Sequence, residues 1–274
     1  MSDIKISFTG KPKIKTLTSA DIVISAVIIV FILITVYTVF FNIEYKWDDF
    51  QDETALDIAS NFIRFDKVGI DKIIEMLLSL INTLSLAFVT TITGFVTGIV
   101  FGLLSARNIS NLYLSNLIRG TASLIRAVPT IIWVLIFVSG YGLSATTAVM
   151  GMFFHTLSFF IKSFAETFEE VDKGTIEALR ASGSNWLQIV FGTILPSSLT
   201  KIISWIAIRS EINFGVAVVI GPAAGVPGTI GSLINNASRG GDYATQGFGV
   251  ILVFLTAYIM EVTINNLRQK SIIN

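Results

Sequence analysis

A long stretch of the chain without any charged residue constrains its fold most strongly. Residues Met76–Ala106 contain no Asp, Glu, Lys or Arg. A helix needs about 20 mostly apolar residues to cross a bilayer, because the hydrocarbon core is about 30 Å thick and each residue rises about 1.5 Å. This stretch therefore predicts a membrane-spanning helix. Within it, Gly94, Gly98 and Gly102 recur every four residues and predict a face that packs closely on a neighbouring helix.

The composition supports a membrane protein and excludes several other classes. Of the 274 residues, 53% are hydrophobic and 14% are charged, whereas soluble domains carry about 25% charged residues. The formal net charge is zero, so no nucleic-acid partner is expected. The chain has no Cys and a single His, which excludes disulfides and thiolate zinc sites and disfavours a Ser-His-Asp triad.

Six segments have the length and polarity of spanning helices. We therefore expect an all-α polytopic membrane protein with six transmembrane helices, in which residues 1–274 form a single transmembrane domain. Arg126 falls near the inner end of the third span, and Pro129 is expected to kink this span or to start its apolar part. A Gly-Tyr-Gly sequence at 140–142 separates the third span from the fourth. The expected spans are Ile22–Phe41, Met76–Ala106, Ala122–Ser139, Ala145–Ile161, Leu199–Ile220 and Phe248–Leu267.

The distribution of basic residues predicts the orientation. Thirteen of the 19 Lys and Arg residues fall in segments on the side of the N-terminus, and five fall on the other side. Cytoplasmic loops carry the excess of Lys and Arg, so both termini are expected to be cytoplasmic, in a bacterial inner membrane. This orientation gives a cytoplasmic tail (1–21), an external acidic segment (42–75) with a short amphipathic helix, and a cytoplasmic segment (162–198).

The cytoplasmic segment 162–198 predicts two short helices that meet at a sharp turn. Asp172 is suited to cap the first helix, and Gly183 supplies the left-handed residue that ends it. Asn185 caps the second helix, with Gln188 as its reciprocal partner. Pro196 is expected to mark the junction with the fifth span.

Residues in this segment resemble the EAA motif of ABC importer permeases. The sequence Glu177-Ala178-Leu179, then Gly183, then Leu195-Pro196 has the order and spacing of that motif. It departs from the motif at Leu179, where a second Ala is common, and at Thr193, where Ile is common. From about Leu77 to its C-terminus the chain resembles the permease of the phosphonate-type ABC importer. The segments that carry this resemblance are Leu104–Asn108, Arg126–Pro129, Phe164–Glu166, Glu177–Gly183 and Arg209–Asn213.

The resemblance implies that the cytoplasmic segment is a coupling helix, which docks on an ATPase subunit. Glu177, Ala178, Leu179 and Gly183 are then the residues that couple the chain to the ATPase. The chain has no G-x-x-x-x-G-K-[ST] phosphate loop, so we expect no enzymatic activity in it. ATP and Mg²⁺ are expected on a separate ATPase subunit, and no cofactor or metal is expected in this chain.

The same resemblance implies a set of partners and a cargo. The expected partners are a second copy of the chain, two cytoplasmic ATPase subunits, an extracytoplasmic solute-binding protein and the surrounding membrane lipid. The expected cargo is a phosphonate or a related oxyanion such as phosphate or phosphite, moved by alternating access. Two alternatives stay open: an ABC permease for another solute, such as an amino acid or vitamin precursor, and a secondary transporter, although no internal repeat is present.

Two groups of residues are candidates for the pathway and its gate. Arg209 and Asn213 lie four residues apart in the fifth span and share a face, whereas Glu211 points elsewhere. These three residues either line an anion pathway or form a structural contact with another span. The candidate outer-gate residues are Gly221, Gly225 and Gly228. The alternative is that their segment is a plain external loop without a gating role.

Overall fold

The computed structural model describes residues 5–6, 12–13, 19–43 and 55–273. The chain divides into two compact units, Met1–Ala55 and Leu56–Asn274. Most of the expected tail 1–21, and residues 44–54 of the expected external segment, lie outside the described residues.

The first unit contains one long helix. Helix α1 (Ser19–Tyr37) ends in a π-helical turn at Thr38–Asn42 and has no buried residue. Its apolar side chains surround the helix on every side, which suits a helix that contacts lipid. The expected first span is therefore helical. Two short strands, β1 (Lys5–Ile6) and β2 (Pro12–Lys13), pair antiparallel before it.

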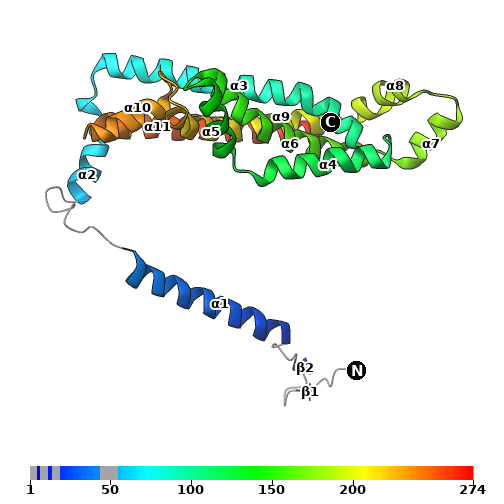
Figure 1. The fold of residues 1–274 in the computed structure, drawn as a ribbon, viewed down its shortest axis with the longest axis horizontal. Helices are drawn as coiled ribbons and strands as arrows, with labels where there is room; N and C mark the ends of the chain where they lie inside the picture. Colours follow the sequence, from blue (N-terminus) through cyan, green and yellow to red (C-terminus); the bar gives the residue numbers. More distant parts are fainter. Residues whose placement is uncertain (1–4, 7–11, 14–18, 44–54, 274) are drawn as a thin grey trace. The chain divides into compact units, whose positions relative to one another are not determined.

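The second unit is a bundle of long helices (Figure 1). In it, α7 and α8 lie at one end and α10 at the other. Five helices of the described chain are long and apolar enough to cross a membrane, and the bent pair α4–α5 gives a sixth span if it is counted as one. The helices are α2 (Ala55–Phe62), α3 (Ile70–Ser105), α4 (Leu112–Ala127), α5 (Thr130–Tyr141), α6 (Ala145–Glu169), α7 (Lys173–Ala181), α8 (Trp186–Ile189), α9 (Leu195–Ala223), α10 (Ile230–Arg239) and α11 (Tyr243–Ile273).

The expected third span, Ala122–Ser139, is not one continuous helix. The chain bends by 85° between α4 and α5. Val128 is extended there, with φ −89° and ψ 122°, because a residue that precedes proline is sterically disfavoured in the α region. The indole Nε1 of Trp133 donates to the carbonyl of Ile125 at 3.1 Å and closes the bend.

The fifth span also differs from the expectation at both ends. The helix does not begin at Pro196, because a π-helical turn (Val190–Ile194) joins α8 to α9, giving one helix from Trp186 to Ala223. At its other end the helix continues through Pro222, and the chain then turns into α10. The glycine-rich segment is therefore a tight turn between two helices rather than a long loop.

Close packing of α3 on α6 fixes the centre of the bundle. The three glycines of α3 face side chains of α6 so closely that an added Cβ would lie only 2.5–2.8 Å from them. The predicted packing role of this face is therefore confirmed. The facing pairs are Gly94 with Thr156, Gly98 with Phe160 and Gly102 with Phe164.

Candidate functional site

The segment of α7 and α8 has the local geometry that its sequence predicts. The carboxylate of Asp172 accepts a hydrogen bond from the backbone amide of Thr175 at 2.8 Å and so caps α7. Gly183 has a φ of +87°, a left-handed conformation that costs other residues about 1–2 kcal/mol. Asn185 and Gln188 form a reciprocal capping box at the start of α8, with distances of 2.9 and 2.8 Å. Both helices and the turn are therefore specified by local sequence.

Two hydrogen bonds anchor this segment to the turn that follows α3. Arg180 donates to the carbonyl of Asn108 at 3.0 Å, and the indole Nε1 of Trp186 donates to the carbonyl of Ile109 at 3.0 Å. Beneath these bonds an apolar core joins the segment to α6. We name it the aromatic core; its buried members include Phe160, Phe164, Phe168, Leu103, Ile176, Ile189, Val190 and Ile194. The α7–α8 segment is therefore packed continuously against α6.

The four candidate coupling residues do not all face outward. Glu177, Ala178 and Gly183 are exposed, so a partner protein can reach them. Leu179 is half-buried and packs against the aromatic core. The Leu179 side chain is therefore suited to hold α7 on the bundle, and the other three residues are suited to contact a partner.

The buried polar residues of α9 join three helices. Arg209 is 3% exposed and Asn213 is fully buried. Both contact Thr156 of α6, so they share a face of α9, as their spacing predicts. The amide of Asn213 accepts a hydrogen bond from Thr156 at 3.1 Å and donates one to Thr91 of α3 at 2.9 Å. Glu211 is half-buried and takes no part in these contacts. We name Thr91, His155, Thr156, Arg209 and Asn213 the polar centre.

Arg209 makes only neutral contacts within the described residues. Its guanidinium donates to the hydroxyl of Thr156 at 3.0 and 3.3 Å, and it lies 5.1 Å from the ring centroid of Phe159. It also meets Nδ1 of His155 at 3.2 Å, and since a guanidinium only donates, Nδ1 accepts. No carboxylate of the described chain forms an ion pair with it. A buried cation with only neutral partners retains its attraction for an anion.

Of the three candidate gate glycines, Gly221 lies in the last turn of α9, and Gly225 and Gly228 lie in the turn between α9 and α10. Gly225 and Gly228 have φ values of +58° and +68°, and an added Cβ on Gly221 would collide with Thr229. Asn82 of α3 donates to the carbonyl of Gly228 at 3.0 Å and holds the turn in place. Gly221, the nearest of the three in the sequence, lies 12 residues beyond Arg209, about 18 Å along α9, so the gate candidates and the polar centre are separate.

Sequence reasoning did not find the partners of Arg209 and Asn213. They come from α3 and α6, which lie far from α9 in the sequence. A signal was present, because Thr91 and the pair His155-Thr156 place polar side chains in the middle of otherwise apolar runs. Which of these residues meet could not be read from the sequence.

Comparison with known families gives a match over most of the bundle. Residues 98–268 match the model of the binding-protein-dependent transport system inner membrane component. The phosphate-import permease protein of Mycolicibacterium smegmatis is 28% identical over 200 residues, 72% of this chain and 36% of that protein. The phosphite transport system permease protein of Stutzerimonas stutzeri is 30% identical over 143 residues, 52% of each chain. The chain thus spans only about a third to a half of the length of these relatives.

Other similar proteins are named for amino acids. The probable D-methionine transport system permease protein of Pasteurella multocida is 28% identical over 204 residues, 70% of this chain and 90% of that protein. An inward-facing structure of the MetNI methionine ABC transporter has a TM-score of 0.67 at 20% identity, over 74% of this chain and 99% of that chain. This likeness shows the ABC importer permease fold. Because the family model matches more than half of the sequence, the chain belongs to the inner membrane components of binding-protein-dependent transport systems.

Proposed function

We propose that this chain and a second copy of itself form the membrane pathway of an ATP-driven importer for a phosphonate or a related oxyanion such as phosphate or phosphite. The assignment of the cargo rests on one observation: Arg209 is a buried cation with neutral partners at the centre of the bundle. A guanidinium offers two parallel N–H donors, which match two oxygens of a phosphate-type group. The names of the phosphate and phosphite relatives support the same cargo.

The proposal assigns the partners to the two ends of the bundle. Two cytoplasmic ATPase subunits bind ATP and Mg²⁺ and contact the α7–α8 segment at Glu177, Ala178 and Gly183. A solute-binding protein docks on the opposite side, near the turn between α9 and α10. A solved bacterial alginate ABC transporter in complex with a periplasmic protein, with a TM-score of 0.58 at 14% identity, has this fold and supports such an assembly.

In the proposed mechanism the chain transmits a movement of the ATPase to the helices in the membrane. ATP binding displaces α7 and α8, and the aromatic core transmits that displacement to α6 as a rigid-body motion. Because Thr156 and His155 lie on α6, the motion changes their distance from Arg209 on α9. The guanidinium then exchanges these neutral acceptors for the oxygens of the cargo, and the pathway opens to alternate sides.

The orientation is part of the proposal and can be tested separately. Ser184 precedes α8, and Ser238 is exposed on α10 at the other end of the bundle. Since the native chain has no Cys, single cysteines at these positions label cleanly. In intact cells an impermeant maleimide is expected to label Ser238→Cys and to spare Ser184→Cys. The reverse pattern contradicts the orientation.

Uptake identifies the cargo. The permease is expressed with its cognate ATPase and binding protein in cells that lack their own phosphate and phosphonate importers. We expect uptake of radiolabelled phosphate, phosphite or methylphosphonate that depends on ATP and on Arg209. Uptake of an amino acid, with no competition from any of these oxyanions, would contradict the cargo.

An amino-acid permease is the second candidate. The methionine relative supports it, because the match spans 90% of that protein, a larger share than for the phosphate and phosphite relatives. Methionine is zwitterionic, so its carboxylate is the group that Arg209 would meet. Adding labelled methionine to the same uptake assay separates the two candidates.

A further inference from the structure

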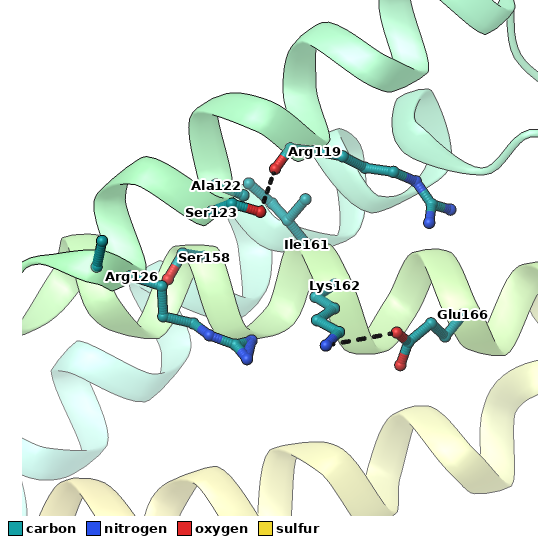
Figure 2. A pocket seen from close by; sticks show the side chains of 9 residues that line it. Arg119, Ala122, Ser123, Arg126, Ser158, Ile161, Lys162 and Glu166 are labelled. Carbon is teal, nitrogen blue, oxygen red and sulfur yellow. Dashed lines mark hydrogen bonds and ion pairs between the residues drawn. The ribbon is translucent and has the colours of Figure 1, made fainter.

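A cleft opens between α4 and α6 (Figure 2). Its volume is about 370 Å³, enough for a small anion. Three of its lining side chains are basic: Arg119 and Arg126 from α4, and Lys162 from α6. None of the contacts of the polar centre uses this cleft.

Two of the three cations already have carboxylate partners. Arg119 is bound to Glu169 at 2.5 Å and donates through Nε to the carbonyl of Ser105 at 2.9 Å, so its charge is neutralised and its position fixed. Lys162 is 3.8 Å from Glu166, and both side chains are more than half exposed. An exposed pair of this kind contributes about 0–1 kcal/mol, so Lys162 is available to a stronger partner.

Arg126 differs from both. It is exposed, and within the described chain it forms no hydrogen bond and no ion pair. In Figure 2 its guanidinium extends from α4 into the space that the Lys162 ammonium enters from α6. A planar guanidinium can donate to two oxygens of one group, and an ammonium can donate to a third.

The rest of the lining favours an anion over water alone. Ala122 and Ile161 are buried, and with Ala127 they form an apolar wall beside the cations. An apolar wall lowers the local dielectric constant and strengthens the attraction between a cation and an anion. The cleft therefore combines a charge without a partner, a second weakly held charge and a surface that excludes part of the solvent.

We propose that Arg126 and Lys162 bind a phosphate-type group in this cleft, carried either by a free phosphorus oxyanion or by the headgroup of an anionic lipid. If the bound group is the free oxyanion, the inference rests on the proposed function and adds a second anion-binding site to the pathway. Lys162 follows His155, a contact of Arg209, by seven residues, about 10 Å along α6 toward the coupling segment. An anion that leaves Arg209 toward the coupling segment then meets Arg126 and Lys162.

The first experiment measures binding of inorganic phosphate. The permease is assembled with its cognate ATPase subunits in nanodiscs of phosphatidylcholine, and equilibrium binding of radiolabelled phosphate is measured. We expect Arg126→Gln and Lys162→Gln each to weaken binding about tenfold, since each removes a charge-assisted hydrogen bond. Arg239→Gln is the matched control, because Arg239 is exposed at the end of α10 and far along the chain from the cleft.

The second experiment tests the lipid source. The same complexes are assembled in nanodiscs that contain phosphatidylglycerol, and native mass spectrometry counts the lipids that remain bound. Retention by the wild-type complex and the Arg239→Gln control, with loss in Arg126→Gln, assigns the group to a lipid headgroup. The proposal is overturned if both Arg126→Gln and Lys162→Gln match the wild type in phosphate binding and in lipid retention.

The proposed function and this inference fail in different ways. Oxyanion uptake by cells, with phosphate and lipid binding unaffected by Arg126→Gln and Lys162→Gln, refutes the cleft and leaves the cargo standing. Loss of phosphatidylglycerol in Arg126→Gln, in a transporter that imports only methionine, refutes the cargo and leaves the cleft as a lipid site.

Discussion

Helix α6 contacts its neighbours in two different ways, one turn apart. From Phe160 to Phe168 it contributes three fully buried rings to the aromatic core, and the rings of Phe160 and Phe164 stack at 4.9 Å. At Thr156, four residues earlier, its contact with Arg209 and Asn213 is made through hydrogen bonds. Close packing resists displacement, because every shift opens a void or a clash, whereas a hydrogen bond can be exchanged for another of similar strength.

This difference assigns a separate task to each region. The aromatic core is suited to carry movement from α7 and α8 without absorbing it. The polar centre is suited to change its partners when that movement arrives. Damage to the first region should therefore remove the folded protein or its coupling, and damage to the second should leave an assembled complex that transports poorly.

The largest effect is expected where α3 packs on α6. In Gly98→Val the new side chain meets Phe160, which an added Cβ alone would approach to 2.5 Å. Overpacking of a core costs about 1–3 kcal/mol, and a contact this close with the Cβ of Phe160 leaves little room for relief. We expect the yield of folded permease, measured by size-exclusion chromatography in detergent, to fall to a small fraction of the wild-type yield. Gly215→Val is the control, because nothing lies within 4 Å of its Cβ position.

A second substitution separates coupling from folding. Gly183→Val places a β-branched residue at a φ of +87°, which strains the turn by about 1–2 kcal/mol. We expect the permease to insert and bind its ATPase, and substrate-stimulated ATP hydrolysis to fall severalfold. Gly183→Asn is the matched variant, since Asn tolerates this conformation better, and it should retain more activity. Full stimulation in Gly183→Val would show that the turn does not transmit the signal.

Substitutions that remove or keep the positive charge of Arg209 test the role of the polar centre. In Arg209→Gln we expect normal assembly and about tenfold lower oxyanion uptake per assembled complex, because the cationic donor is lost. Arg209→Lys retains the charge without the planar fork and should fall between Arg209→Gln and the wild type. Glu211→Gln, on another face of α9, should change little. If assembly falls together with uptake in Arg209→Gln, the residue is structural, and the contrast between the two regions disappears.

The smallest effect is expected where α8 meets the turn that follows α3. Trp186→Phe removes the hydrogen bond to the carbonyl of Ile109 and keeps an aromatic ring in place. The loss of one such bond costs about 0.5–1.5 kcal/mol. Hydrogen exchange in α7 and α8 should become faster while α9 stays protected, and transport should fall only slightly. Unchanged exchange would show that the apolar contacts hold the segment without this bond.

The parts of the molecule that local sequence determines could be predicted. The caps at Asp172 and Asn185 and the left-handed Gly183 depend only on residues within one helical turn, and each is confirmed. The glycine face of α3 could be predicted as a packing surface because its spacing matches the helical period. Five or six spans follow from hydropathy alone.

Features that depend on competing or distant interactions could not be predicted. A break at Pro129 could be expected from the proline, but the 85° size of the bend could not. The contacts of Arg209 bridge 53 or 54 residues of sequence, and the contact of Asn213 with Thr91 bridges 122. Periodicity places each of these residues on a face, but it does not say which faces meet.

The π-helical turn at Val190–Ile194 also sets the rotational phase of α9. A π-turn accommodates one extra residue, and one residue corresponds to about 100° of rotation in an α-helix. Every side chain of α9 is therefore aimed by this turn as well as by its own position. Deletion of one residue between α8 and α9, with every other residue intact, would swing Arg209 away from Thr156. The number of residues between the coupling segment and the fifth span thus determines which face of α9 points into the bundle.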